Sequence, residues 1–283
     1  MKTFFNKSEL SQHLEGLKAK GKSVGMVPTM GALHQGHLSL VEKGLQQSDV
    51  VVVSIFVNPT QFNNAEDLEK YPRTLKRDVA LLETVSKETI IVYAPTPDDI
   101  YDHNVESESF TFEGLEHEME GAFRPGHFDG VGTIVKRLLM AVNPDEAYFG
   151  EKDFQQLAII KKMVKLHNID VEIIGCPIYR ADDGLAMSSR NERLKPEYRD
   201  VAPFIYQTLQ TAKEKFGTKS ARKVAEWVER QFKKHPLLKL EYFTIADTET
   251  LRPLKRKSNK KNYRAFIAVY AGEIRLIDNI ALN

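Results

Sequence analysis

Short apolar runs alternate with amphipathic stretches over roughly the first 180 residues of the chain. The clearest run, residues 50–57, is rich in β-branched side chains, as a buried parallel strand should be. The same criteria predict strands over residues 23–28, 50–57, 90–93, 146–149 and 171–176, and helices over residues 37–47, 74–85, 131–142 and 154–167. This alternation predicts an α/β fold with a Rossmann-like, mostly parallel sheet and helices on both faces.

A further helix is expected before the first of these strands. Leu10, Leu14 and Leu17 recur with helical spacing, so they define one apolar face. Ser8 is the expected N-cap of this helix, and Gly21 is placed where glycine commonly follows a helix C-terminus.

The pattern changes near residue 180. Helical periodicity covers residues 197–216 and 221–234, and strand-like runs follow at residues 240–246, 263–270 and 274–280. We therefore expect two domains: a Rossmann-like nucleotide- and substrate-binding domain over residues 1–183, and a smaller α+β domain over residues 184–283 that covers the active site.

Composition narrows the class of partner. Lys and Arg number 40 against 39 Asp and Glu, so there is no global field to attract nucleic acid or an anionic membrane. The single cysteine, Cys176, excludes an intramolecular disulfide and a cysteine-rich zinc site. Residues 1–14 lack the apolar stretch of a signal peptide, and we expect a cytoplasmic protein.

Residues 28–37 join a predicted strand to the start of a helix. Unpaired amides and the helix dipole favour anions at such a place, and Gly31 and Gly36 allow the backbone to approach a phosphate. The glycine spacing resembles a P-loop, but the Lys and Ser/Thr that should follow are missing. His34 and His37 can instead donate to phosphate oxygens. A surface loop with incidental histidines, or a zinc pair, stays open as an alternative.

Residues 56–62 follow the buried strand at 50–57. The amides of Asn58 and Gln61 both donate and accept, which suits the hydroxyls and carboxylate of a small polar substrate. A simple turn built around Asn58-Pro59 is the alternative for this segment.

Residues 149–156 lie between another strand and helix. Lys152 at a helix N-terminus opposes the helix dipole, which makes sense if an anion binds there. Asp153 can cap the helix or orient Lys152, and Gln156 lies one turn into the helix.

Residues 184–191 contain two hydroxyls, Ser188 and Ser189, and the guanidinium of Arg190, whose fork fits phosphate oxygens. Alone this is an ordinary polar loop.

All four segments, however, follow strands of one predicted sheet, and ligands bind outside the carboxyl ends of such strands. We therefore expect the four segments to meet in one crevice.

These motifs support a resemblance to a known family. The His-x-Gly-His sequence of residues 34–37 resembles the HxGH signature of the class I nucleotidyltransferase superfamily, and residues 187–190 resemble its mobile serine-containing loop. Within that superfamily the chain is similar to the pantothenate synthetase family at residues 28–31, 56–62, 124–128, 150–153 and 184–191. Tyr179 departs from the smaller aliphatic residue expected there, which affects the fine shape of the ATP site.

The resemblance implies an AMP-forming ligase that condenses (R)-pantoate with β-alanine through pantoyl adenylate, releasing AMP and pyrophosphate. It implies ATP as a substrate, Mg²⁺ carried with the ATP phosphates and no protein metal ligand. The implied partners are small molecules and a second copy in a homodimer, without nucleic acid or membrane.

The resemblance also implies roles for particular residues. Those expected to act in catalysis are His34, His37, Lys152 and Arg190. ATP-binding residues are Met30, Gly31, His34, His37, Gly150, Lys152, Asp153, Tyr179, Met187, Ser188, Ser189 and Arg190. Gln61 and Gln156 are expected to bind pantoate, with Asn58 in support. Gln61 is also expected to contact β-alanine.

Two other functions stay open at this point. One is a different adenylyltransferase of the same superfamily, acting on another acid or a mononucleotide. The other is a nucleotide-sensing or RNA-binding module on the same fold. Residues 254–264 hold six lysines and arginines, which form either an RNA-binding patch or a solvated hairpin loop with Ser258 and Asn259 at its tip.

Overall fold

The structure is a computed structural model that describes residues 1–62 and 65–283. It divides into two compact units. Unit 1 comprises Met1–Glu151 and Gln155–Pro177, and unit 2 comprises Lys152–Phe154 and Ile178–Asn283. The short segment Lys152–Phe154 therefore belongs with the C-terminal part of the chain. The domain boundary expected between residues 183 and 184 stays a prediction.

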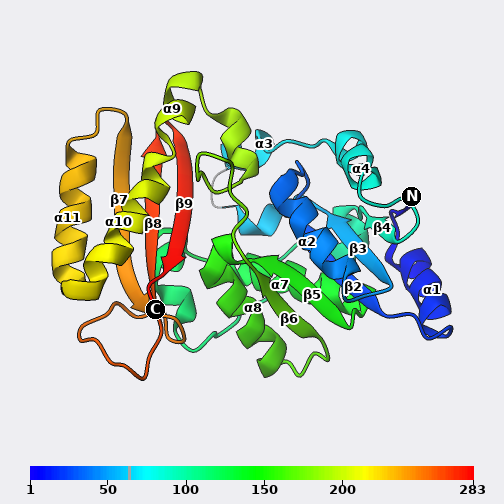
Figure 1. Ribbon diagram of the computed structural model, residues 1–283. Coiled ribbons are helices and arrows are strands. Elements are labelled where there is room, and N and C mark those ends of the chain that lie inside the picture. The colour runs from blue at the N-terminus through cyan, green and yellow to red at the C-terminus, as the bar shows by residue number, and fades with distance from the viewer. Residues whose placement is uncertain (63–64) are drawn as a thin grey trace. The chain divides into compact units, whose positions relative to one another are not determined.

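Unit 1 is built on a parallel sheet (Figure 1). Within the described residues the strands, in spatial order, are β1 (Lys2–Phe4), β4 (Ile90–Tyr93), β3 (Val50–Ile55), β2 (Val24–Thr29), β5 (Glu146–Gly150) and β6 (Glu172–Cys176). All of the pairings between them are parallel, as predicted. The edge strand β1 has three residues and was not predicted, because so short a run shows no periodicity.

The chain order of these strands creates a switch point. From β2 the chain moves to β3 and then β4 on one side, and it later returns to β5 on the other side of β2. In open α/β sheets such a reversal leaves a crevice at the carboxyl ends of the two strands. The segments that follow β2 and β5 are therefore placed where ligands of this fold class bind.

Helices flank the sheet of unit 1. The α-helices are α1 (Lys7–Lys18), α2 (Gln35–Leu45), α3 (Ala65–Glu69), α4 (Leu75–Glu83), α5 (Pro97–Tyr101), α6 (Met119–Phe123), α7 (His127–Val142) and α8 (Phe154–Leu166), and the short 3₁₀ turns are η1 (Pro59–Gln61) and η2 (Leu115–His117). The 3₁₀ turn η3 (Glu151–Asp153) and the first residue of α8 lie where the chain passes through the Lys152–Phe154 segment of unit 2. Two helices begin earlier than predicted: α2 at Gln35 and α7 at His127.

The N-cap of α1 differs from the expected one. The Asn6 side chain accepts from the amides of Ser8 (2.9 Å) and Glu9 (3.3 Å), so the cap lies two residues before the predicted Ser8. Both residue types are good N-caps, and the pattern alone does not decide between them.

Burial explains the continuous apolar strands. On β3, Val51 and Val52 point to opposite faces of the sheet, yet both are fully buried. Val51 packs in a cluster with Val41 of α2 and Leu82 of α4, so these helices cover one face. Burial on both faces is the reason that β3 reads as an unbroken apolar run rather than an alternating one.

Unit 2 has an antiparallel sheet with helices packed on it (Figure 1). Over the described residues its strands are β7 (Leu238–Asp247), β8 (Tyr263–Ala271) and β9 (Ile274–Ala281), and its helices are α9 (Pro196–Val201), α10 (Phe204–Thr218) and α11 (Ala221–Lys233), with the 3₁₀ turn η4 (Ser189–Arg193). The predicted helix over residues 197–216 is two helices, because Pro203 lacks the amide needed to continue α9.

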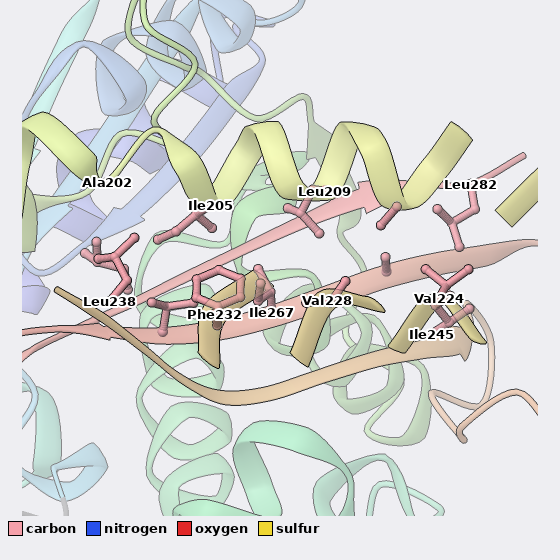
Figure 2. Close-up of a cluster of buried hydrophobic side chains, with 14 of the residues drawn as sticks. Ala202, Ile205, Leu209, Val224, Val228, Phe232, Leu238, Ile245, Ile267 and Leu282 are labelled. Carbon is pink, nitrogen blue, oxygen red and sulfur yellow. The ribbon is translucent and has the colours of Figure 1, made fainter. Parts of the chain in front are cut away.

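The core of unit 2 lies between the helices and the sheet (Figure 2). Ile205 and Leu209 of α10, with Val228 and Phe232 of α11, gather around Ile267 on β8. These residues are buried, so unit 2 has a hydrophobic core of its own. The predicted α+β character of the C-terminal part is confirmed.

None of the helices in the described parts of the chain is long and apolar enough to cross a membrane.

Candidate functional site

The residues predicted to bind ligands are divided between the two units. Unit 1 contains Met30, Gly31, His34, His37, Asn58, Gln61, Gly150 and Gln156. Unit 2 contains Lys152, Asp153, Tyr179, Met187, Ser188, Ser189 and Arg190.

In unit 1 the predicted residues cluster at the ends of adjacent strands. The segment 28–37 begins with the last two residues of β2, residues 56–62 follow β3, and Gly150 ends β5. β2 pairs in parallel with both β3 and β5, so these three carboxyl ends lie at one edge of the sheet. Gln156 lies half-buried in the first turn of α8.

The turn after β2 is shaped by a buried carboxylate that the sequence analysis did not single out. Asp78 of α4 is fully buried and accepts from the amides of Ala32 (3.0 Å) and Leu33 (2.9 Å). Gly31 has a φ of +81°, and a Cβ there would lie 3.0 Å from Asp78 Oδ2. Glycine therefore fits this turn for two reasons, its φ and the closeness of Asp78.

The turn delivers the two histidines to the start of α2. His34 is the N-cap residue and His37 lies in the first turn, with ring centroids 4.0 Å apart. The His34 amide donates to His37 Nδ1 at 3.3 Å. Because Nδ1 accepts, a neutral His37 ring carries its proton on Nε2. His37 Nε2 is thus the nitrogen able to donate to a ligand.

Gln61 is held by Asn58 after β3. Asn58 is 1% exposed, and its Nδ2 donates to Gln61 Oε1 and to the Gly130 carbonyl, both at 3.1 Å. The Tyr101 hydroxyl donates to Asn58 Oδ1 at 2.5 Å. Burial raises the pKa of Tyr101, which keeps this phenol neutral and able to donate. Gln61 Nε2 contacts Met30 Sδ at 2.9 Å, so this amide joins the segments that follow β2 and β3.

Arg124 and His127 hold the main chain of Gln61. His127 Nδ1 donates to the Gln61 carbonyl at 2.9 Å, while Arg124 donates to His127 Nε2 at 3.1 Å. These contacts require a neutral His127 with its proton on Nδ1. One turn further along α7, a Cβ on Gly130 would lie 2.4 Å from the Thr60 carbonyl oxygen. The start of α7 therefore packs directly against η1 and fixes its position.

In unit 2, Lys152 is held through its main chain. Its carbonyl accepts from Asn279 Nδ2 of β9 at 2.8 Å, and its Nζ lies 3.2 Å from Asp153 Oδ1. Of the two uses predicted for Asp153, the contact with Lys152 is present in the structure. The adjacent Phe154 ring stacks beneath the guanidinium of Arg264, 4.3 Å from the ring centroid.

The segment containing residues 179–191 folds back on itself in unit 2. The Met187 amide donates to the Tyr179 carbonyl at 3.0 Å, and Arg180 forms an isolated antiparallel bridge with Ala186. Ser188 caps η4 by accepting from the Arg190 amide at 3.3 Å. The side chain of Tyr179 is exposed, so its ring is available to a ligand.

The basic residues of the segment 254–264 lie on the connection between β7 and β8, except Arg264, which lies at the start of β8. Lys257 Nζ lies 3.7 Å from the centroid of the Phe216 ring, and burial lowers the pKa of Lys257. Lys261 pairs with Asp247 at 2.9 Å, and Arg264 is buried. Half of the six cations are thus engaged within unit 2, which agrees better with the hairpin-loop alternative than with an RNA-binding patch.

The residues missed by sequence reasoning left different signals. Asp78 interrupts an apolar helical face between Leu75 and Leu82, which is a detectable anomaly for a carboxylate. His127 lies in the segment 124–128 that carried the resemblance, but no role was assigned to it. Asn279 left no local signal, because its partner Lys152 is 127 positions away.

Comparison with known proteins gives a consistent family. A model of the pantoate-beta-alanine ligase family matches residues 2–281. A pantothenate synthetase from Christiangramia forsetii is 58% identical over 283 residues, covering 100% of both chains. Another from Flavobacterium psychrophilum is 55% identical over 280 residues, covering 99% of both.

Solved structures agree. The pantothenate synthetase of Thermus thermophilus has a TM-score of 0.91 and 40% identity, with 100% of this chain and 99% of that chain covered. A pantoate-beta-alanine ligase from Francisella tularensis, complexed with beta-gamma ATP and β-alanine, has a TM-score of 0.80 and 35% identity, covering 100% and 98%. The resemblance stated from the motifs is confirmed, and the chain belongs to the pantoate-beta-alanine ligase family.

Proposed function

We propose that this chain condenses pantoate with β-alanine in two steps driven by ATP. In the first step a pantoate carboxylate oxygen attacks the α-phosphorus, and the bond to the bridging oxygen breaks, giving pantoyl adenylate and pyrophosphate. In the second step the neutral amine of β-alanine attacks the acyl carbon. The amine then loses a proton, AMP leaves, and the amide bond of pantothenate is complete.

The observation that carries the proposal is the placement of His37. Its Nε2 is a hydrogen-bond donor at the start of α2, at the switch point of the sheet. Negative charge grows on the phosphate oxygens as the carboxylate attacks, and a preorganised donor lowers the energy of that state. His34 adds a second imidazole at the positive end of the same helix, on a turn whose own amides are held by Thr29 and Asp78. Met30 and Tyr179 would contact the adenosine.

The charged residues of unit 2 would bind the polyphosphate. Lys152 and Arg190 supply cations, with hydroxyls from Ser188 and Ser189 beside Arg190 in sequence. Gly150, Asp153 and Met187 are proposed as further ATP contacts. We place Mg²⁺ on the ATP phosphates, because Mg²⁺ keeps several waters and commonly uses substrate phosphates as ligands.

Gln61 and Gln156 would bind the hydroxyls and carboxylate of pantoate. With Gln61 Oε1 occupied by Asn58, Gln61 Nε2 is the atom that would donate to a carboxylate or hydroxyl oxygen. Asn58 acts in support, since its amide hydrogens are used inside the protein. The Francisella tularensis relative that was solved with a nucleotide and β-alanine supports the same substrate classes here. The homodimer and the cytoplasmic location stay predictions.

Pyrophosphate exchange tests the proposal. Labelled pyrophosphate should enter ATP only when pantoate is present, with β-alanine left out, and adding β-alanine should release AMP. A matched pair of variants, Lys152→Ala and Lys162→Ala, keeps the change in charge equal. Lys152→Ala should lose on the order of 10²-fold or more in turnover, as expected for one charged transition-state contact. Lys162 pairs with Glu113, and turnover of the Lys162→Ala variant should equal that of the unsubstituted protein.

The outcomes separate the alternatives. Exchange that needs another acid would keep the chemistry but assign a different adenylyltransferase. ATP binding without exchange, whatever acid is supplied, would contradict the ligase proposal and support a nucleotide-binding module.

A further inference from the structure

Two consecutive residues of β9 hold the unit 2 segments that we propose to bind phosphate, the Lys152 segment directly and the loop 184–190 through Arg180. Asn279 bonds the Lys152 carbonyl through Nδ2 at 2.8 Å. Its neighbour Asp278 receives Arg180 in a bidentate ion pair, with distances of 2.7 and 2.9 Å. Neither residue was among the predicted site residues. Both are buried, at 4% exposure for Asp278 and 1% for Asn279.

The orientation of the Asn279 amide is determined by a cation. Arg264 donates to Asn279 Oδ1, and a guanidinium has no acceptor atom, so Oδ1 must face Arg264. Nδ2 then faces the Lys152 carbonyl, which can only accept. Arg264 itself rests on the ring of Phe154, two residues after Lys152. Each of these hydrogen bonds has a fixed donor and a fixed acceptor, and together they hold the Lys152 main chain against β9.

Asp278 holds the loop 184–190 indirectly, through its ion pair with Arg180. The Arg180 guanidinium also donates to the carbonyls of Gly184 (3.1 Å) and Asn279 (3.3 Å) and stacks on Tyr206, 3.6 Å from its centroid. Gly184 has a φ of +91° and begins the loop that contains Ser188. Burial raises the pKa of the Asp278 carboxyl, and the ion pair with Arg180 opposes this shift.

We propose that Asp278 and Asn279 are positioning residues that hold the Lys152 segment and the loop 184–190 in one fixed relation on unit 2. The proposal rests on the proposed function, because it takes these two segments as the ones that bind the ATP polyphosphate. A buried ion pair adds little stability over an apolar pair of similar volume, but it specifies geometry where a site needs it. Small displacements of such a site reduce turnover steeply, on the order of 10²-fold for 1 Å.

Asn279→Asp is the most selective test. The substitution keeps shape and volume, and the new carboxylate still accepts from Arg264. It replaces the donor that faces the Lys152 carbonyl with an acceptor, so the Lys152 peptide must move. We expect KM for ATP in the exchange reaction to rise about 10- to 100-fold, with KM for pantoate unchanged. Thermal unfolding followed by Trp227, the single tryptophan of the chain, should stay within a few degrees of the unsubstituted protein.

Arg275→Gln is the matched control. Arg275 lies on the same strand and pairs with Glu241 of β7, so the variant also breaks a charged contact of β9. Its exchange kinetics should equal those of the unsubstituted protein. If Asn279→Asp folds poorly, Arg264→Met removes the contact that orients Asn279 and should give the same selective rise in KM for ATP.

Equilibrium binding of ATP, measured by calorimetry, separates this inference from the proposed function. Weaker ATP binding by Asn279→Asp, and not by Arg275→Gln, supports the positioning role even if pantoate proves to be the wrong acid. Unchanged ATP affinity and unchanged KM in a folded Asn279→Asp protein would overturn it. A loss of activity that only follows the loss of folded protein would overturn it as well.

Discussion

The Gln61 segment of unit 1 and the Lys152 segment of unit 2 are held in different ways. In unit 1, the Gln61 side chain is oriented by the neutral amide of Asn58, and the Gln61 carbonyl accepts from a neutral His127 and from Arg124. In unit 2, Lys152 and the loop 184–190 are tied to β9 by interactions that involve the buried charges of Arg180 and Asp278. A neutral hydrogen bond adds about 1 kcal/mol, whereas an unpaired buried charge costs several times more. Isosteric substitution should therefore cost less at Asn58 than at Asp278, whereas the turn after β2 in unit 1 also depends on a buried carboxylate, Asp78.

The chain carries one natural probe in each unit, which makes the comparison measurable. Cys176, the single cysteine, ends β6 in unit 1 and is buried. Trp227, the single tryptophan, packs against the core of unit 2. Alkylation of Cys176 and fluorescence of Trp227 thus report on the two units separately within the same sample.

The largest effect is expected for Asp278→Asn. The variant keeps the shape of the side chain but leaves the Arg180 guanidinium without its carboxylate partner. The free energy of unfolding should fall by about 3–5 kcal/mol, as for other buried pairs that lose one partner. Urea denaturation followed by Trp227 fluorescence measures this. The double variant Arg180→Met with Asp278→Leu should recover most of the loss. If Asp278→Asn alone lowers the free energy of unfolding by less than about 1 kcal/mol, the contrast between the Gln61 and Lys152 segments is contradicted.

Gly130→Ala should produce the next largest effect, and in unit 1. The added methyl group would lie 2.4 Å from the Thr60 carbonyl oxygen and 2.8 Å from Gln61 Cα, so α7 and η1 must separate. We expect a loss of about 1–3 kcal/mol and a higher KM for pantoate. The rate of Cys176 alkylation in increasing urea measures the stability.

Gly217→Ala is the control for that substitution. Gly217 lies near the end of α10, and nothing lies within 4 Å of the position that an added methyl group would take. Alanine should therefore stabilise unit 2 by about 0.5–1 kcal/mol. Equal effects of the two glycine substitutions would show that the contact between α7 and η1 has no energetic importance.

His127→Ala should have a moderate effect. It removes the nearer of two donors to the Gln61 carbonyl, which also accepts from Arg124 at 3.4 Å, so the loss should be about 1 kcal/mol, as for one hydrogen bond. KM for pantoate should rise while KM for ATP stays constant. His127→Asn can place an amide nitrogen close to the position of Nδ1 and should restore much of the affinity. If both variants bind pantoate equally well, the hydrogen bond to Gln61 is not what orients it.

The smallest effect concerns Cys176 and alkaline pH. Burial raises the pKa of this thiol above its ordinary value of 9.0, so the folded protein should be alkylated slowly even at that pH. An acid whose pKa is raised by folding stabilises the protein fully below its unfolded pKa. That stabilisation is lost as pH rises through the folded pKa. The stability of unit 1 should therefore decline above about pH 9, and less so in Cys176→Ala. Fast alkylation of the native protein would contradict the burial of Cys176.

Periodicity and local chemistry accounted for much of this molecule. Apolar runs separated by helical patterns predicted the strands β3, β4 and β5 and their parallel direction. The position of residues 30–34 between a predicted strand and a predicted helix indicated the histidine turn between β2 and α2. Boundaries were less accurate, as at α7, because His127 and Gly130 are placed by their contact with η1 rather than by helix propensity. The roles of the predicted ligand-binding residues stay to be tested by the substitutions above.

The amino-acid sequence by itself determined the fold class of each part, the family and the segments that carry chemistry, because apolar periodicity and short motifs are local properties. Tertiary structure alone decided which buried groups hold those segments. Asp78 reaches the turn after β2 across 45 residues, and Asn279 reaches Lys152 across 127. The physical reason is that a buried polar group must find a partner once water is removed, and its partner is chosen by proximity in the folded chain rather than in the sequence.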